Sequence, residues 1–273
     1  MSFAALQRLL PQHGLSRLAG RFARSQTPWI RRTFIHTFSR AYNVDLSDSL
    51  RSSPDDYESF NDFFTRELRA DTRPMPNDPL CVACPADGSI SQVGRLTHDK
   101  LMQAKGTNYS LRSLTGADLP QFHEGAFITI YLAPNDYHRV HLPVTARLVR
   151  TAAIPGELFS VNAKTEATIS DLFCRNERLV CHFESSHGDM LVILVGALVV
   201  ASIETVWPGP ESPYRSLTQN THGLRLERGC EIGRFLLGST VIVCFEPGRM
   251  ELDGTLHAGI KVRMGQSIGR LIG

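Results

Sequence analysis

The chain has no long hydrophobic run. Its longest apolar stretch, residues 190–203, has 14 residues and is interrupted by Gly196. A membrane-spanning helix needs about 20 apolar residues, so the sequence predicts no transmembrane segment. The Val and Ile content of this stretch favours buried strands instead. A signal peptide is not expected either, because Leu9 and Leu10 are followed by Pro11 and arginines rather than by a longer apolar core.

Acidic residues are missing from the first 44 positions. This segment contains seven arginines, whereas the net charge of the whole chain is only +2, so most of the charge asymmetry is N-terminal. Apolar residues recur among the arginines at helical spacing, which predicts amphipathic helices. The two apolar rows are Leu15, Leu18 and Phe22, and then Ile30, Phe34, Ile35 and Phe38.

Cysteines are few and scattered. Of the six, only Cys81 and Cys84 form a Cys-x-x-Cys pair, and the second pair that a zinc ribbon needs is missing. Pro85 follows Cys84 directly, where a redox motif would normally open a helix. The sequence therefore predicts reduced, partly buried thiols and no metal site.

The pattern of the chain changes near residue 70. Residues 1–70 read as helical, with Ser53 and Pro54 predicted to start a helix over Tyr57–Leu68. A proline-rich stretch at 72–79 ends this region, and residues 71–273 form the second predicted domain. Short apolar runs separated by Gly and Pro then predict strands at 90–93, 126–132, 146–150, 179–183, 191–206, 240–245 and 260–264. The expected fold class is α+β, with N-terminal amphipathic helices followed by a mostly β, barrel-like or sandwich-like domain.

One Gly-Ser peptide bond near the C-terminus is a candidate for self-cleavage. Gly238 and Ser239 lie between an apolar run and residues 240–243, as in a turn between two strands. A serine hydroxyl in this position can attack the peptide bond that precedes it, convert the amide to an ester, and leave a new terminus after elimination. An ordinary turn is the simpler alternative.

Two histidines and one aspartate are further candidates. His138 and His141 are near neighbours if their segment is a helical turn and face opposite sides if it is a strand. Either arrangement can place a proton carrier beside the serine, although two ordinary loop histidines explain the pattern as well. Asp87 precedes Gly88 in an Asp-Gly pair, which by itself is typical of a turn.

Together these segments resemble the signature segments of phosphatidylserine decarboxylase proenzymes. The resemblance rests on Leu-Gly-Ser-Thr at 237–240, Tyr-His-Arg-Val-His at 137–141 and Ala-Asp-Gly at 86–88. Further agreement is found at 155–162, 176–178, 195–197 and 202–207. The N-terminal region resembles that of the bacterial, membrane-associated type.

The resemblance implies a self-cleaving enzyme. Ser239 would attack the carbonyl of Gly238, and His141, oriented by Asp87, would take its proton, as in a serine protease triad by role but not by fold. The products would be a β chain of residues 1–238 and an α chain of residues 239–273. A covalent pyruvoyl group would stand where Ser239 was, and it would withdraw the electrons left on the α-carbon when carbon dioxide leaves an amino acid.

Substrate roles also follow from the resemblance. His138 would position the carboxylate or protonate the α-carbon, although the division of labour between His138 and His141 stays open. The substrate pocket is expected to include Phe159, Ser160, Val161 and Asn162, with a structural loop as the alternative.

The resemblance implies that the arginine-rich N-terminus binds a membrane. Its basic amphipathic helices suit an anionic membrane surface, so the expected location is peripheral, on the cytoplasmic face of the bacterial membrane. Internal packing and an arginine-rich transit peptide are alternatives, and nucleic-acid binding is disfavoured because stacking aromatics are not interleaved with the arginines. The two cleaved chains would form a heterodimer, which in this family favours a dimer of such pairs.

The sequence leaves alternative functions open. The chain could be a non-catalytic lipid-binding scaffold, or a pyruvoyl-dependent decarboxylase of another amino-acid substrate. A conventional serine hydrolase is a third alternative, but Ser239 is not set in a Gly-x-Ser-x-Gly motif.

Overall fold

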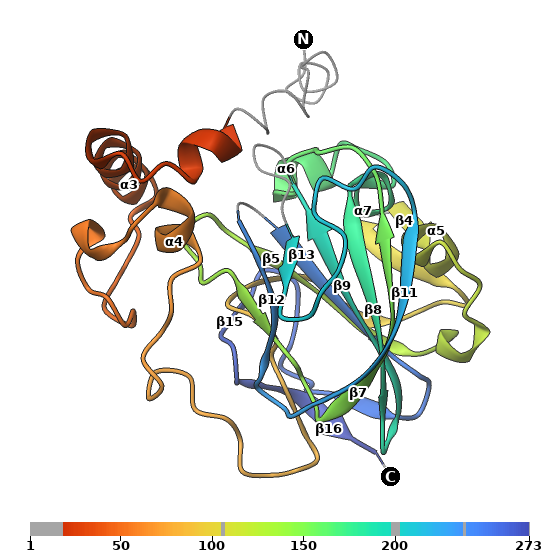
Figure 1. Ribbon diagram of the computed structural model, residues 1–273. Helices are drawn as coiled ribbons and strands as arrows, with labels where there is room; N and C mark the ends of the chain where they lie inside the picture. The colour runs from red at the N-terminus through yellow and green to blue at the C-terminus, as the bar shows by residue number, and fades with distance from the viewer. Residues whose placement is uncertain (1–18, 105–106, 198–202, 237–238, 273) are drawn as a thin grey trace.

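A helical region and a β domain make up the protein. The structure is a computed structural model that describes residues 19–104, 107–197, 203–236 and 239–272. Figure 1 shows α3 (Pro28–Tyr42) and α4 (Phe60–Phe64) together on one flank of the β domain. A helical stretch at 19–23 precedes α3, and the 3-10 turn η1 (Pro54–Asp56) lies between α3 and α4. Helices followed by a largely antiparallel β domain confirm the predicted α+β class.

The helical region has its own aromatic core. Ile35 of α3 is fully buried and packs in one cluster with Tyr57, Phe60, Phe63 and Phe64. The apolar row predicted on α3 is therefore divided, because Phe34 of the same row is 41% exposed while Ile35 is buried. Of the first predicted row, Leu15 and Leu18 lie outside the described residues.

The helix predicted over Tyr57–Leu68 is much shorter than expected. Ser53 does cap a proline-initiated turn, but the chain is extended again at Tyr57. Ser59 then caps α4, which begins at Phe60 and stops after one turn. The prediction was wrong in length because the chain from there turns back, and Leu68 forms a β-bridge with Ser49.

The β domain is built around one large sheet. Among the described residues, eight strands pair antiparallel in the order β11-β7-β8-β9-β13-β5-β2-β15. Their bounds are β2 Gly88–Arg95, β5 Ala126–Leu132, β7 Ala146–Ile154, β8 Arg178–Ser185, β9 Gly188–Gly196, β11 Thr218–Leu226, β13 Ser239–Phe245 and β15 Lys261–Val262. The central strands β5, β9 and β13 are buried almost throughout, which explains their continuous apolar sequences.

Smaller elements cover both faces of this sheet. One three-stranded sheet has the order β1-β16-β14 and a second has the order β10-β12-β6, while β3 pairs with β4. Their bounds are β1 Cys81–Ala83, β3 Lys100–Ala104, β4 Thr107–Ser110, β6 Arg139–His141, β10 Ile203–Thr205, β12 Glu231–Phe235, β14 Met250–Leu252 and β16 Ser267–Leu271. The remaining helices are α5 Leu111–Thr115, η2 Pro120–Phe122, α6 Ala163–Glu166 and α7 Leu172–Arg175.

Two hydrophobic clusters separate these layers. One joins the large sheet to the two three-stranded sheets, and the other joins its opposite face to α5 and α7. The domain is thus sandwich-like, and no pairing within the described residues closes β11 onto β15. The strand predicted at 260–264 is only the two-residue β15, because Met264 and Gly265 already bond to the loop before β2.

The described residues contain neither a membrane-spanning helix nor a disulfide or a metal-binding cluster. No helix there is both long and apolar enough to cross a bilayer. All six cysteines are free thiols, as predicted, and four of them are buried. Within the same residues, no group of three or more His, Cys, Asp or Glu side chains is placed to hold a metal ion.

Candidate active site

Ser239 is the first residue of β13, at the centre of the large sheet. Its backbone pairs with Leu132 of β5 on one side and with Gly196 of β9 on the other. The side chain is fully buried, and its Oγ has no hydrogen-bond partner among the described residues. An unpaired buried hydroxyl costs about 1–3 kcal/mol, so it requires an explanation other than stability. Gly238, the other half of the predicted cleavage site, lies outside the described residues.

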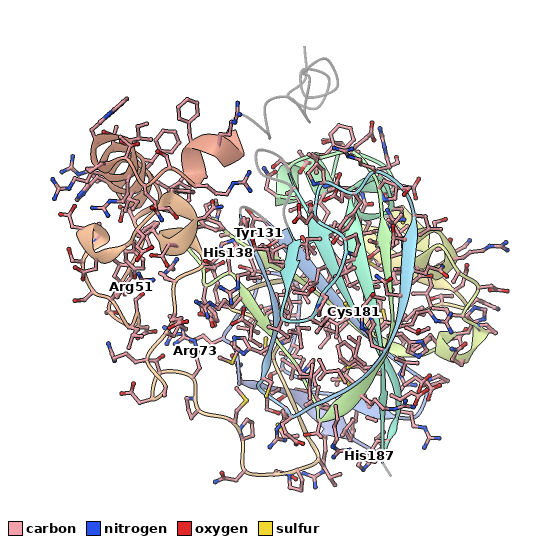
Figure 2. The ribbon with its side chains drawn as sticks, viewed as in Figure 1. Arg51, Arg73, Tyr131, His138, Cys181 and His187 are labelled. Carbon is pink, nitrogen blue, oxygen red and sulfur yellow. The ribbon has the colours of Figure 1, made fainter. Side chains whose placement is uncertain are left out.

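His138 lies between β5 and β6, against the helical region. Its Nδ1 donates to the carbonyl oxygen of Asp136 at 2.8 Å, which leaves the lone pair on Nε2. This Nε2 is buried and has no described partner. The ring packs on Phe64 with 4.0 Å between centroids, and Figure 2 shows His138 on the side of the β domain that faces the helices. Burial lowers the pKa of His138 to about 3, so the imidazole is a neutral base at physiological pH.

Hydrogen bonds hold the His138 segment beside the strand end that carries Ser239. The amide of Phe235, four residues before Ser239, donates to the carbonyl of His138 at 3.0 Å. On the other side, Asp136 Oδ2 accepts from the amide of Ala133, which directly follows the β5 partner of Ser239. The fold therefore brings His138 and Ser239 to the same end of the β5–β13 pair.

His141, in contrast, is fully engaged. It ends β6, and its Nδ1 donates to the carbonyl of Gly229 at 2.8 Å. Its Nε2 accepts from the hydroxyl of Tyr137 at 2.9 Å, and the two rings are stacked with 5.7 Å between centroids. Burial lowers the pKa of His141, which favours the neutral imidazole.

Asp87 binds an arginine. Arg73 Nε lies 3.0 and 3.2 Å from the two carboxylate oxygens of Asp87, and its Nη2 also donates to this carboxylate. The amide of Met264 donates to Asp87 Oδ1 at 2.8 Å, and Arg73 is shared with Asp48. This ion pair is largely shielded from water, with side-chain exposures of 8% for Arg73 and 12% for Asp87.

Asp87 and His141 are neighbours without a direct hydrogen bond between them in the described residues. The amide of His141 donates to the carbonyl of Pro85, two residues before Asp87, at 2.8 Å. The Asp87 charge also favours the protonated form of His141, although burial and the bond to Gly229 affect its pKa more. In this uncut chain, therefore, Gly229 and Tyr137 orient His141.

The loop predicted to bind substrate begins beside the same strand end. Asn176 Oδ1 accepts from the backbone amide of Phe159, and Asn176 Nδ2 donates to the carbonyl of the same residue. Nδ2 also donates to the carbonyl of Gly196, the β9 partner of Ser239. The side chains of Phe159 and Val161 lie in the hydrophobic core. The guanidinium carbon of Arg175 lies over the Phe159 ring, 4.8 Å from its centroid. Ser160 and Asn162 bond to one another and to Thr165, at the start of α6.

Comparison with known proteins gives the same family as the motifs. Residues 60–270 match the family model described as phosphatidylserine decarboxylase, and residues 2–43 match one described as PSD. The phosphatidylserine decarboxylase proenzyme of Methylococcus capsulatus is 49% identical, over 98% of this chain and 96% of its own length. Those of Alcanivorax borkumensis and Bordetella avium are each 47% identical, over 98% and 97% of this chain and 95% and 93% of their own. This chain belongs to the phosphatidylserine decarboxylase family.

This result confirms the enzyme class that the sequence predicted, a phosphatidylserine decarboxylase made as a proenzyme, and with it the predicted serine-derived pyruvoyl cofactor. Site contacts that the sequence analysis missed are those of Tyr137, Arg73 and Asn176. Tyr137 could have been suspected because it stands inside the histidine motif. Asn176 stands in the 176–178 segment of the family resemblance, which marks the position but not its partners. The Arg73 contact depends on a pairing between distant segments and leaves no local signal.

Proposed function

We propose that this chain is a proenzyme that cuts itself between Gly238 and Ser239 and then decarboxylates phosphatidylserine to phosphatidylethanolamine. Family membership supports the substrate and the reaction. The observation that carries the proposal is the buried Oγ of Ser239, unpartnered among the described residues, at the strand end that also holds His138. The proposed domains are 1–70 and 71–273, and the separate aromatic cluster between Ala23 and Phe64 supports that division.

In the cutting step, the Oγ of Ser239 attacks the carbonyl carbon of Gly238 and gives up its proton to a neutral imidazole. The peptide nitrogen leaves the carbonyl carbon, and an ester replaces the amide. Loss of the Ser239 α-proton then expels the Gly238 carboxylate and leaves a dehydroalanine. Water adds to its imine tautomer and ammonia departs, so the new N-terminus carries a ketone. We assign the proton of the Ser239 hydroxyl to His141, which returns it to the departing peptide nitrogen, and the nearby Asp87 carboxylate favours the imidazolium formed in between.

A pyruvoyl group at residue 239 would supply an electron sink for the substrate's α-carbon as carbon dioxide leaves. Ser239, buried at the end of a central strand with no partner for its Oγ among the described residues, is a site that such a group fits, because burial excludes competing water. His138 holds the open Nε2 that can transfer a proton to or from substrate. The backbone around Phe159 and Asn162 is proposed to border the substrate.

The two products of cutting remain one heterodimer. The α chain of residues 239–273 supplies β13, which lies between β9 and β5 of the β chain. It also supplies β15, paired with β2, and β16, paired with β1. Separating the chains would expose these ladders and the apolar cluster beneath them, so cutting does not release the small chain.

Peripheral binding to the cytoplasmic face of the bacterial membrane is part of the proposal. The helical region exposes large apolar side chains, with Trp29 72% and Phe22 41% accessible. Arg21 and Arg24 are exposed beside them. Aromatic and basic side chains on one region are the combination that anionic lipid surfaces bind.

An intact mass spectrum of the denatured protein tests the proposal. Wild-type protein should give two chains that separate between Gly238 and Ser239, with a carbonyl-bearing terminus on the 35-residue piece. The Ser239→Ala variant should stay a single folded chain without decarboxylase activity toward phosphatidylserine. An active preparation that consists of one uncut chain would contradict the proposal.

A further inference from the structure

A charged cavity lies between the helical region and the β domain. Its volume is about 340 Å³, and its lining combines residues after α4 with the loop before β2 and the turn between β5 and β6. Four cations line it, Arg66, Arg73, Lys261 and Arg263, together with four aspartates, Asp45, Asp48, Asp87 and Asp136. Three of the cations have carboxylate partners, since Arg73 binds Asp87 and Asp48, Lys261 lies 3.6 Å from Asp136, and Arg263 lies 3.9 Å from Asp48.

Arg66 is the exception. Within the described residues it forms no ion pair with a carboxylate, although its side chain is buried and the residue is only 4% exposed. Its Nη2 donates to the backbone carbonyls of Asn135 at 2.8 Å and Asp136 at 3.3 Å. Its Nε and Nη1 are buried and have no described partner, and the ring of Phe63 lies 6.0 Å from the guanidinium carbon.

A buried cation with unused N–H groups is unfavourable unless an anion completes it. An isolated buried charge is strongly penalised, and a guanidinium does not lose its proton to avoid that penalty. Burial lowers the pKa of Arg66, and the nearby Asp87 and Asp136 charges offset this effect only in part. Charge-assisted bonds from arginine to phosphate oxygens are among the stronger polar contacts in proteins.

Arg66 lies close to the proposed catalytic groups. Arg66 Nη2 and His138 Nδ1 donate to the same carbonyl oxygen, that of Asp136, at 3.3 and 2.8 Å. Asp87, Gly88 and Tyr137 line the same cavity. Ser89 of β2 and Thr240 of β13 pair with Tyr131 of β5 from opposite sides, so β5 lies between them. Gly88 and residue 239 are the preceding residues of these two strands. The cavity edge at Gly88 is therefore two strand spacings, about 10 Å, from the reacting residue.

We propose that Arg66 binds the phosphodiester of the phosphatidylserine headgroup. This assignment rests on the proposed function, and it names the part of the substrate that the cavity recognises. In the substrate only a few bonds separate the phosphate from the amine that must reach residue 239. The two non-bridging phosphate oxygens can accept hydrogen bonds from Nε and Nη1 of Arg66, which have no partner among the described residues, once a shift of the side chain exposes these buried atoms to the cavity.

The substrate carboxylate is the less suitable anion for Arg66. Its charge leaves the carboxyl oxygens as carbon dioxide forms, so a cation fixed on it would stabilise the substrate more than the transition state. The phosphodiester keeps its charge throughout the reaction. Binding it at Arg66 therefore lowers KM without slowing the chemical step.

Steady-state kinetics of purified, self-cleaved enzyme test this assignment. The substrate is dihexanoyl-phosphatidylserine below its micelle concentration, so that membrane binding plays no part. Arg66→Gln should raise KM by roughly 10- to 100-fold, as expected for loss of charge-assisted hydrogen bonds, and change kcat by less than about threefold. Arg69→Gln, which removes an exposed cation three residues away, is the matched control and should leave KM at the wild-type value.

An inhibitor distinguishes the two anions of the substrate. Dihexanoyl-phosphatidylmethanol carries the phosphodiester but neither amine nor carboxylate, and it should inhibit wild type competitively. Its inhibition constant should rise in Arg66→Gln by the same factor as KM. A raised KM with unchanged inhibition would assign Arg66 to the carboxylate and overturn the proposal, as would an unchanged KM.

A second variant keeps the test independent of the folding role of Arg66. Asn135→Asp adds a negative charge to the exposed cavity rim and retains the backbone carbonyl that binds Arg66. It should raise KM at least about threefold relative to Asn135→Ala, and equal values would overturn the proposal. An inactive wild type would overturn the proposed function and this assignment together. An active wild type with an unaffected Arg66→Gln would overturn the assignment alone.

Discussion

The candidate site has two halves that differ in how their polar atoms are bonded. In the Asp87–His141 half, both imidazole nitrogens have partners, and the carboxylate is held by Arg73 and the amide of Met264. In the His138–Ser239 half, a buried nitrogen and a buried hydroxyl have no described partner. Because an unpaired buried polar atom lowers stability, the second half gives up stability where a substrate or a peptide bond has to react.

The difference indicates two kinds of contribution to one reaction. A hydrogen-bonded group is oriented before the reaction, and it has to exchange its hydrogen-bond partner for the reactant. An unpaired group is accessible to a reactant from the start. The following experiments either separate the two halves further or show that the distinction has no chemical consequence.

The largest effects are expected from the two histidines. His141→Gln should block self-cleavage, because we assign His141 as the base for Ser239. His138→Gln should still cut but lose most decarboxylation, because the open Nε2 serves the substrate. Intact mass and product release from phosphatidylserine measure the two steps separately. Normal cutting in His141→Gln together with an uncut His138→Gln would reverse the assignment.

The ion pair of Asp87 should matter next, through stability. Asp87→Asn leaves the buried Arg73 with Asp48 alone, and breaking such a pair typically costs about 3 kcal/mol. Asp48→Asn should cost less, because that carboxylate is 34% exposed. Urea unfolding in a Ser239→Ala background compares both variants as single uncut chains. Equal losses would show that the Asp87 contact is no stronger than the exposed one.

The buried histidine should make stability depend on pH. His138 stays neutral in the folded protein because its pKa is about 3, whereas the unfolded chain protonates it near pH 6.5. The unfolded state therefore binds more protons below pH 6.5, and the free energy of unfolding falls as pH falls. Between pH 7 and 5 this contribution is about 2 kcal/mol. In the Ser239→Ala background, His138→Gln should reduce the measured loss by that amount, and an identical loss would disprove the buried neutral state.

The smallest effect is expected from Tyr137. Tyr137→Phe removes the hydroxyl that occupies Nε2 of His141 and so frees this nitrogen before cutting. Self-cleavage should become about fivefold faster, which corresponds to one hydrogen bond of about 1 kcal/mol. Time-resolved gel analysis of freshly refolded proenzyme measures the rate. Slower cutting would show that the hydroxyl assists His141 rather than restrains it.

Local patterns predicted the elements of the fold better than their lengths. The run at 126–132 is β5 with the same bounds, and Thr240–Phe245 lies within β13. The helix over Tyr57–Leu68 and the strand at 260–264 failed, because each segment is shortened by bonds to residues far away in the chain. Propensity and periodicity act over a few residues, so they cannot anticipate such contacts.

The sequence by itself determined the helical and β regions, the family, and the residue types of the site. Only the tertiary structure decided which partner each of these residues takes. Asp87 meets Arg73 from the proline-rich stretch, His141 meets Gly229, and Arg66 reaches the turn that holds His138. The physical reason is that hydrogen-bond partners are chosen by packing between segments that the sequence separates by many residues. The same packing buries Ser239 and His138 with a polar atom of each left unpaired among the described residues.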